Sequence, residues 1–443
     1  MYNRHRQHLH FVGIGGVGMA GIAEILLNLN YSVSGSDIAR NSLIDHLEEL
    51  GARVAVGHAA ENVRADTSVM VVSSAISPEN PEIEFARNNN IPVIPRAEML
   101  AELMRMKYGL AVAGSHGKTT TTSMLAKMLT DAGFDPTVII GGRVLTKRSG
   151  AKLGKGEYLV AEADESDGSF GLLRPAISIV TNIDAEHLNH YGSFGELEMA
   201  FGDFMASVPF YGAVVACFDD PIVANLARKL KRRVISYGLA PGSDVTATDL
   251  VAEGASTSFN LLVGGKQVSR VKLPLPGSHM VSNSLAAVAV GIELGIDFEK
   301  ICFALESFPG VARRSELIGI NAGVAVLDDY AHHPTEIKAT LSALRAGWLA
   351  RMATEQGAST MGRLVVLFQP HRYSRTKDLF SQFVEVFGDA DELIVGDIYA
   401  AGEKPIEGVT GENLALAIKH TRVSYVSDLK NAVAPLASKL RAG

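Results

Sequence analysis

The segment HFVGIGGVGMAGIA, residues 10–23, decides how the N-terminal part of the chain folds. Gly13, Gly15 and Gly18 have the spacing G-x-G-x-x-G, after an apolar run and before a helical pattern. Glycines permit a tight turn, and the free N–H groups of the helix start can bind a phosphate. Asp37 ends the next predicted strand, where a carboxylate can hold a ribose hydroxyl. This pattern predicts a nucleotide site, but it also fits NAD binding or a tight turn without a ligand.

Strand-like and helix-like segments alternate outward from this loop along the whole chain, which is typical of parallel α/β sheets. We expect three α/β domains, at residues 1–107, 108–309 and 310–443. One stretch differs, because residues 257–277 alternate apolar and polar side chains around Gly264 and Gly265. That stretch predicts an antiparallel hairpin with the two glycines at its turn.

Composition excludes several classes of protein. The chain has 443 residues and a formal charge of −7, so it lacks the overall positive field that favours nucleic acid. Cys217 and Cys302 are too few for a disulfide framework, which fits a reducing cytosol. Glycines interrupt the first apolar run, unlike the core of a signal peptide. With no apolar run long enough to span a bilayer, we expect a cytoplasmic protein without a membrane partner.

A second glycine-containing loop, Gly114-Ser115-His116-Gly117-Lys118-Thr119, lies between an apolar strand and a threonine-rich helix start. Its N–H groups could cradle phosphates, its lysine could neutralise them, and its threonine hydroxyl could bind Mg²⁺. It departs from the usual phosphate loop because Val112 stands where a glycine is usual. The segment nevertheless predicts an ATP site more strongly than an ordinary helix start.

Two acidic and histidine-rich segments follow later strands. They are EADESD at residues 162–167 and NIDAEHLNHY at residues 182–191. Carboxylates at the carboxyl ends of strands face the ligand crevice of an open α/β sheet, and Mg²⁺ prefers oxygen ligands. One acid of the first segment is expected to complete a metal site with Thr119, whereas most of the others fit a solvated loop. A ligand role and a structural role are equally compatible with the second segment.

The last third of the chain carries two more polar loops after apolar strands, DDYAHHP at 328–334 and QPHRYSR at 369–375. Arginine binds carboxylates and phosphates through two parallel hydrogen bonds. Arg372 and Arg375, three residues apart, therefore predict a carboxylate clamp. Surface ion pairing is the alternative.

Together these segments resemble the Mur ligase family. The resemblance covers nearly the whole chain and rests, in order, on HFVGIGGVGMAGIA, SSAI, AGSHGKTTTT, EADESD, NIDAEHLNHY, GSHMVSN, DDYAHHPTEI and QPHRYSRT. It implies an α/β fold of three domains. These are a Rossmann-like UDP-binding domain, a central P-loop ATPase-type domain and a C-terminal Rossmann-like domain that receives the amino acid. The first glycine loop would then bind UDP instead of NAD.

The resemblance also assigns roles to individual residues. The UDP-sugar would contact Gly13, Gly15, Gly16, Gly18, Asp37, Ser73, Ser74 and His116. ATP would contact Gly114, Ser115, His116, Gly117, Lys118, Thr119, Thr120, Asn283, Arg314 and Asp329. Metal ligands would be Thr119, Glu162 and His187. L-Alanine would be bound by Tyr330, His332, Arg372 and Arg375. The catalytic set would be Lys118, His187, His332, Arg372 and Arg375.

The implied activity is that of the family's alanine-adding branch. ATP would drive amide formation between the carboxylate of UDP-N-acetylmuramate and L-alanine through an acyl phosphate, in peptidoglycan precursor synthesis. Two Mg²⁺ ions are expected, and Mn²⁺ could replace them. Alternatives are a recycling ligase that attaches a peptide to the same UDP-sugar, an NAD-dependent dehydrogenase, and a nucleotide-binding regulator. The sequence leaves the oligomeric state open.

Two departures from the family pattern bear on these expectations. Several relatives use a carbamylated lysine after the NIDAEH-type motif, but no lysine occurs here between Leu188 and Ala227. Its absence fits the alanine-adding branch. The family also continues past ASKLRAG into another strand, whereas this sequence stops at Gly443. The third domain is therefore expected to be incomplete at its C-terminus.

Overall fold

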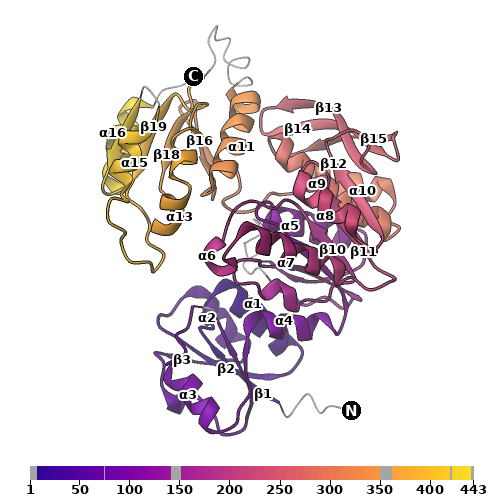
Figure 1. Cartoon of the computed structure of the whole chain (residues 1–443), viewed down its shortest axis with the longest axis vertical. Coiled ribbons are helices and arrows are strands. Elements are labelled where there is room, and N and C mark those ends of the chain that lie inside the picture. The colour runs from indigo at the N-terminus through magenta and orange to yellow at the C-terminus, as the bar shows by residue number, and fades with distance from the viewer. Residues whose placement is uncertain (1–6, 74, 141–150, 350–361, 420–421, 441–443) are drawn as a thin grey trace. The chain divides into compact units, whose positions relative to one another are not determined.

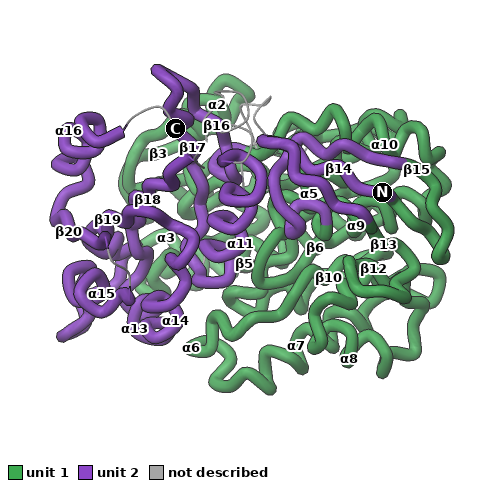
Figure 2. Tube along the Cα trace, turned by 90° about the horizontal axis from the view of Figure 1, so that it is seen from above, with its two compact units in different colours: residues 1–248, 261–269, 282–311 green, residues 249–260, 270–281, 312–443 purple. Residues whose placement is uncertain are grey.

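A computed structural model describes residues 7–73, 75–140, 151–349, 362–419 and 422–440. The chain divides into two compact units, coloured separately in Figure 2. Unit 1 comprises residues 1–248, 261–269 and 282–311, and unit 2 comprises residues 249–260, 270–281 and 312–443. Ser74, which belongs to the predicted UDP contacts, lies outside the described residues.

Unit 1 begins with a five-stranded parallel sheet of order β3-β2-β1-β4-β5 (Figure 1). Its strands are β1 (His8–Val12), β2 (Ser32–Asp37), β3 (Arg53–Val56), β4 (Thr67–Val72) and β5 (Val93–Pro95). Its helices are α1 (Val17–Asn28), α2 (Ser42–Glu49), α3 (Pro81–Asn88) and α4 (Arg96–Met104), with a 3₁₀ turn, η2 (Ala60–Asn62). All five residues of β1 are buried because β1 is central. The order reverses at β1, so the loop after β1 lies at a switch point where such sheets bind ligands.

The second sheet has ten strands, and seven of them lie wholly in unit 1, in the order β12-β11-β10-β6-β9-β7-β8. They are β6 (Tyr108–Ala113), β7 (Thr137–Ile139), β8 (Ala151–Lys152), β9 (Tyr158–Glu162), β10 (Ile177–Val180), β11 (Ala213–Cys217) and β12 (Val234–Gly238). All pairs are parallel except β7 with β8. The helical elements are α5 (Lys118–Asp131), η3 (Ser169–Leu172), α6 (Leu188–Tyr191), α7 (Phe194–Ala206), α8 (Pro221–Lys229), α9 (Ser278–Glu293) and α10 (Phe298–Glu306). The buried β6 and β10 place the loops that follow them at one sheet edge.

The predicted hairpin is confirmed. Strands β14 (Ser256–Val263) and β15 (Lys266–Leu273) are neighbours, and β13 (Val245–Glu253) precedes them. Gly264 and Gly265 have φ angles of 55° and 76°. A two-residue hairpin turn with positive φ at both positions matches the right-handed twist of its strands, and glycine adopts it without steric cost.

The C-terminal part of unit 2 contains a parallel sheet of order β18-β19-β20 and an antiparallel pair, β16 with β17. Their bounds are β16 (Glu316–Asn321), β17 (Val324–Asp328), β18 (Val365–Phe368), β19 (Glu392–Gly396) and β20 (Val423–Val426). The helices are α11 (Pro334–Leu344), the π-helix η4 (Arg345–Leu349), α13 (Tyr373–Asp378), α14 (Phe380–Phe383), α15 (Gly411–Ala417) and α16 (Lys430–Lys439). Phe383, Leu393, Val395 and Leu414 are fully buried in its core.

The α/β alternation expected from the sequence is confirmed in both units. Each glycine loop lies between a strand and a helix, and the polar segments of the last third follow β17 and β18. Within the described part of the chain, no helix is both long enough and apolar enough to cross a bilayer.

Candidate active site

The first glycine loop, after β1, is held by the end of β2. The N–H groups of Gly13 and Ile14 donate to the backbone oxygen of Ser36, at 2.8 and 3.1 Å. The N–H of Gly15 donates to Oδ2 of Asp37 at 2.8 Å. Gly13 has a φ of 81°, a left-handed conformation in which a side chain would be strained. The predicted acid of the second strand therefore lies directly against the predicted loop.

Two further side chains border this loop. Ser73, another predicted contact, lies beside Gly13, since a methyl group added to Gly13 would be 3.3 Å from Cβ of Ser73. Arg96, at the start of α4, lies beside Gly18, and its Nη2 is 3.4 Å from Oδ2 of Asp164. Arg96 was not among the predicted contacts, because it begins a helix and is distant along the chain from both Gly18 and Asp164.

The second loop, between β6 and α5, folds around its own lysine. Nζ of Lys118 donates to the backbone oxygens of Gly114 and Ser115, at 2.5 and 3.2 Å. It also donates to Oε1 of Glu165 at 2.7 Å. Burial lowers the pKa of Lys118, but the charge and hydrogen bond of Glu165 outweigh burial, so the pKa is raised. Lys118 is therefore a partly buried cation at the N-terminus of α5, where phosphate groups bind.

Two predicted ATP residues contribute to the shape of this loop. Gly117 has a φ of 82°, and a methyl group there would overlap the side-chain oxygen of Asn283. Asn283 is nine-tenths buried. Thr119 and Thr120 follow in the first turn of α5. The geometry thus places Asn283, which is distant in sequence, against the loop.

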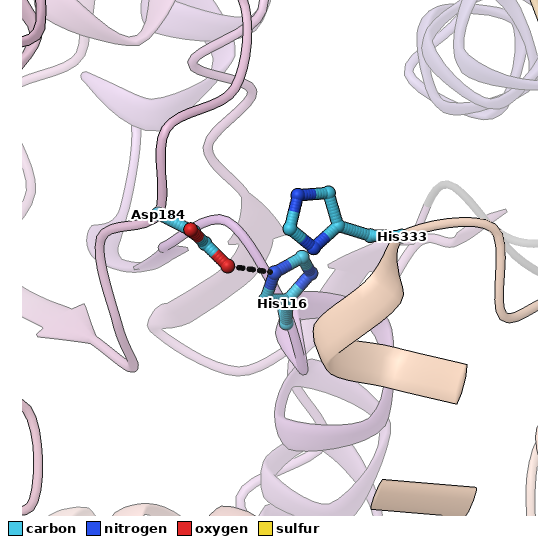
Figure 3. Close-up of side chains that lie close together, drawn as sticks. All are labelled: His116, Asp184 and His333. Carbon is cyan, nitrogen blue, oxygen red and sulfur yellow. Dashed lines mark hydrogen bonds and ion pairs between the residues drawn. The ribbon is translucent and has the colours of Figure 1, made fainter. Parts of the chain in front are cut away.

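The NIDAEH segment, after β10, determines the conformation of His116. The N–H of His116 donates to Oδ1 of Asn182 at 2.8 Å. Its ring Nε2 is 3.1 Å from Oδ2 of Asp184, as the dashed line in Figure 3 shows. Ser115 accepts through Oγ from the N–H of Asp184 at 2.8 Å. The loop of residues 114–119 and the segment of residues 182–191 are therefore joined by hydrogen bonds. His333, also drawn in Figure 3, belongs to unit 2.

A possible metal site lies beside Lys118. One ligand atom each of Glu165, Glu186 and His187 lies within 4.8 Å of the other two. Oε2 of Glu165 is buried and has no hydrogen-bond partner among the described residues. Two carboxylates and an imidazole are a donor set that Mg²⁺ or Mn²⁺ accepts. The residues present therefore fit a divalent cation.

The predicted metal ligands relate to this cluster in different ways. His187 is a member of it and has a φ of 57°, an uncommon left-handed conformation for a residue with a side chain. Glu162 adds to the negative field that raises the pKa of Lys118. Glu165 and Glu186 are buried members of the cluster that were not among the predicted metal ligands. Both lie in the acidic segments EADESD and NIDAEHLNHY. These segments contain several acids, and residue spacing alone does not indicate which of them binds a metal.

Unit 2 brings the predicted alanine-binding residues together around aromatic rings. The ring centroids of Tyr330 and His332 are 4.9 Å apart, and those of His332 and His371 are 5.9 Å apart. Nδ1 of His332 lies 2.8 Å from the backbone oxygen of Tyr330, so this nitrogen is the donor. Burial lowers the pKa of His332 to about 4, so the ring is neutral near pH 7. His371 lies in the QPHRYSR segment but was not among the predicted alanine-binding residues.

The cations of unit 2 surround the same rings. The guanidinium carbon of Arg314 lies 5.6 Å from the Tyr330 ring centroid, and that of Arg313 lies 4.6 Å from it. Arg372 has a φ of 72° and is 4.0 Å from Oε1 of Glu403. Nη1 of Arg375 donates to the backbone oxygen of His371 at 3.4 Å. Burial lowers the pKa of His371, and the charges of Arg375 and Arg372 lower it further, so the two arginines of the predicted clamp lie near His371.

Asp329, a predicted ATP contact, has a local structural role. Its Oδ2 accepts from N and Oγ of Ser315, at 2.7 and 3.1 Å, and its Oδ1 accepts from N of Ala331. Burial raises the pKa of Asp329, and the hydrogen bonds oppose this shift. Asp329 also lines a pocket of about 490 Å³ in unit 2, bordered mainly by apolar residues of β17, β18, α11 and α16. That lining is unsuited to phosphate groups.

The fold and the second loop define an α/β protein of the phosphate-loop class. Three sequence profiles match nearly the whole chain. "Mur ligase family, catalytic domain" matches residues 8–108, "Mur ligase middle domain" matches 112–291, and "Mur ligase, glutamate ligase domain" matches 313–443. The chain belongs to the Mur ligase family and has its three-domain α/β architecture.

Individual relatives place the chain within this family. It is 53% identical over 425 residues to the UDP-N-acetylmuramate–L-alanine ligase of Geobacter sp. strain M21, covering 95% of this chain and 90% of that protein. It is similar to the solved structure of UDP-N-acetylmuramate-alanine ligase MurC from Thermotoga maritima, with a TM-score of 0.79 and 29% identity. That match covers 96% of this chain and 91% of the other. A murein peptide ligase from Psychrobacter arcticus, at 23% identity and a TM-score of 0.69, covers 99% of this chain and 94% of its own and shares the fold.

Proposed function

We propose that this protein uses ATP to join L-alanine to the carboxylate of UDP-N-acetylmuramate, a step of peptidoglycan precursor synthesis. The products are UDP-N-acetylmuramoyl-L-alanine, ADP and phosphate. The observation that carries the proposal is the partly buried Lys118, held in the β6–α5 loop beside the cluster of Glu165, Glu186 and His187. The names of relatives about half identical to this chain supply the substrates.

The reaction needs ATP because a carboxylate has no leaving group that an amine can displace at neutral pH. Transfer of the γ-phosphoryl group to a carboxylate oxygen gives an acyl phosphate and ADP. The amine then attacks the acyl carbon, and phosphate leaves with the former carboxylate oxygen. The protein's work in such phosphoryl and acyl transfers is positioning and charge stabilisation.

In unit 1, Lys118 neutralises charge on the outer phosphates. To reach them, its Nζ must exchange Glu165 for a phosphate oxygen, since Glu165 is its acidic partner in this structure. The loop residues 114–120 and Asn283 surround ATP. We propose that Thr119, Glu162 and His187 hold Mg²⁺, with Glu165 and Glu186 as further candidate ligands. When bound, the cation reduces repulsion between the phosphates and the incoming carboxylate.

The amino-acid substrate is assigned to unit 2. Arg372 and Arg375 bind its carboxylate, since a planar guanidinium group matches a carboxylate through two parallel hydrogen bonds. Tyr330 is assigned to the same amino-acid site. Arg314 and Asp329, in contrast, are assigned to ATP. His332 is the candidate proton acceptor because its Nδ1 donates to the Tyr330 carbonyl, which leaves Nε2 with a lone pair. Its pKa of about 4 keeps it neutral but makes it a weak base in the free protein.

The first glycine loop is assigned to the UDP part of the substrate, together with Asp37, Ser73, Ser74 and His116. The neutral backbone N–H groups at the start of α1 suit a diphosphate. We place the domain boundaries at residues 107 and 309, and we propose a cytoplasmic location because both nucleotides are cytoplasmic metabolites.

Two other activities would give different results in one assay. Purified protein is mixed with ATP, Mg²⁺, UDP-N-acetylmuramate and L-alanine, and phosphate release is measured with each component omitted in turn. The proposal requires release only when both UDP-N-acetylmuramate and L-alanine are present, with a product of matching mass. Release with a tripeptide but not with L-alanine would identify a recycling ligase. Binding of NAD without phosphate release would support a dehydrogenase and contradict the ligase assignment.

A further inference from the structure

A buried carboxylate in the N-terminal sheet takes no part in the predicted ligand contacts. Glu82 is the second residue of α3, and it is 0% exposed. Acidic residues in the first turn of a helix usually point to solvent, because burying a charge is costly unless hydrogen bonds compensate for it. Glu82 instead points into the protein.

Five groups from three segments lie around the carboxylate of Glu82, and the most distant is Nδ1 of His58, 3.9 Å from Oε2. Oε2 accepts from Oγ of Ser36 at 2.6 Å and lies 3.3 Å from Nε2 of His10. Oε1 accepts from Nδ2 of Asn62 at 2.6 Å and from the N–H of Ala59 at 3.2 Å. Burial raises the pKa of Glu82, but the hydrogen bonds from His10, Ser36 and Asn62 outweigh burial, so the pKa is lowered and the group is ionised.

One of these partners leads directly to the first glycine loop. Ser36, whose side chain donates to Glu82, also accepts the N–H groups of Gly13 and Ile14 through its backbone oxygen. The next residue, Asp37, accepts the N–H of Gly15. Glu82 therefore holds Ser36 in place, and Ser36 in turn accepts the hydrogen bonds from the start of the loop.

The other partners lead to the segment after β3. Asn62 donates both to Glu82 and to the backbone oxygen of Gly57, at 2.6 and 3.0 Å. The N–H of Gly57 donates to the backbone oxygen of Asp37 at 2.8 Å. Hence one carboxylate joins His10 of β1 and Ser36 of β2 to the segment that follows β3, near the carboxyl ends of these strands. This is the edge where an open parallel sheet binds its ligand.

The opposite end of β1 provides a comparison. There Nδ1 of His8 lies 3.1 Å from Oγ1 of Thr67, and both side chains are buried. That pair joins β1 to β4 but touches no loop at the carboxyl end of the strands. A buried polar contact that only stabilises the sheet can thus be separated from one that supports the loops.

We infer that Glu82 is a positioning residue for the nucleotide loop, holding Ser36, the 13–15 turn and the 57–62 segment in the arrangement that receives the UDP group. The inference rests on the proposed function, because the ligand class is taken from it. Glu82 does not touch the ligand. It acts through Ser36 and Asn62, whose hydrogen bonds to an ionised acceptor are stronger than those to a neutral one.

The test compares Glu82→Gln and Ser36→Ala with Thr67→Val in the full chain. Titration calorimetry with UDP measures binding directly, and steady-state assays measure KM for the UDP-sugar, KM for ATP and kcat. Loss of a charged hydrogen bond at Glu82 should raise the Kd for UDP and the KM for the UDP-sugar about tenfold. Ser36→Ala should raise both by a smaller factor, while KM for ATP and kcat stay within about twofold. Thr67→Val should lower the melting temperature without changing either nucleotide constant.

Two outcomes would overturn the inference. If Glu82→Gln and Ser36→Ala bind UDP as tightly as the unmodified protein, Glu82 supports only the fold. The same follows if Thr67→Val weakens UDP binding equally, because the effect would then be one of general stability. If Glu82→Gln does not fold, Ser36→Ala alone decides, since it removes only one hydroxyl. Failure of the unmodified protein to bind UDP would instead contradict the UDP assignment itself.

Discussion

The two glycine loops of unit 1 have the same local architecture but different charges. The loop after β1 contains no charged side chain, and its Gly15 N–H donates to the carboxylate of Asp37. The loop after β6 carries Lys118, which is partly buried and paired with Glu165. Both turn through a glycine with φ near 80°, Gly13 in one and Gly117 in the other.

This difference separates two ways of binding a nucleotide. A loop with a partly buried cation beside acids can compensate the charge of a reacting phosphate, which phosphoryl transfer requires. A neutral loop with a carboxylate at its border can orient a nucleotide through backbone N–H groups without activating it. The glycine pattern identifies neither role, whereas the surrounding charges distinguish them.

The largest expected effect is that of Lys118→Ala. Without the cation, the outer phosphates lose their main protein charge partner, and product formation should fall about 10³-fold or more. UDP binding at the first loop should not change, which calorimetry can check. Lys127→Ala is the matched control, because Lys127 lies on the same helix in an exposed pair with Asp131. An unaltered rate of product formation in Lys118→Ala would mean that the charge of the second loop does not distinguish its role from that of the first.

His187→Ala should have the next largest effect. The variant removes one member of the metal-binding cluster, so the Mg²⁺ concentration needed for half-maximal rate should rise at least about tenfold. Activity is measured against Mg²⁺ and Mn²⁺ concentration, and chelation with EDTA should abolish it in the unmodified protein. His190→Ala, in the short helix α6 that His187 precedes, should leave the metal dependence unchanged. Equal effects of the two variants would argue against a cation at this site.

Asp37→Asn tests the first loop alone. An amide can still accept from the Gly15 N–H, but it lacks the charge that a ribose hydroxyl would meet. We expect the KM for the UDP-sugar to rise about tenfold, with KM for ATP unchanged. Asp45→Asn is the control, since Asp45 forms an exposed pair with Arg40. A change in KM for ATP would mean that the two loops are not independent.

The smallest effect is expected from alanine at the two turning glycines. A left-handed alanine costs about 1–2 kcal/mol at either position. Gly117→Ala should cost more than Gly13→Ala because its methyl group would also overlap Asn283, whereas the one at Gly13 meets Ser73 at 3.3 Å. The midpoint of urea unfolding, measured for both variants, tests this order. The reverse order would mean that Asn283 moves away easily.

Much of the fold could be predicted from short segments. The apolar strands, the glycine loops and the Gly264-Gly265 hairpin all follow from local patterns, because strand burial and turn conformation depend on neighbouring residues. The pairing of Asp37 with the first loop was also predictable, since residues at the ends of adjacent parallel strands meet at one edge.

Local patterns could not indicate which of several similar side chains belongs to a candidate site. Glu165 and Glu186, not only Glu162, lie where a cation could bind, and their motifs contain other acids of equal chemistry. The ring of His371 contacts those of Tyr330 and His332, yet the prediction for its motif named only the two arginines that follow it. Which side chain turns inward depends on the path of the backbone after each strand.

The sequence by itself determined the family, the order of the elements and the identity of both glycine loops, because these depend on residue types at fixed spacings. Only the tertiary structure decided that Lys118 is paired with Glu165 and that Glu82 lies beneath the first loop, 46 residues beyond Ser36. Such contacts join residues far apart along the chain. They exist only after the strands have paired, so no local pattern in the sequence can specify them.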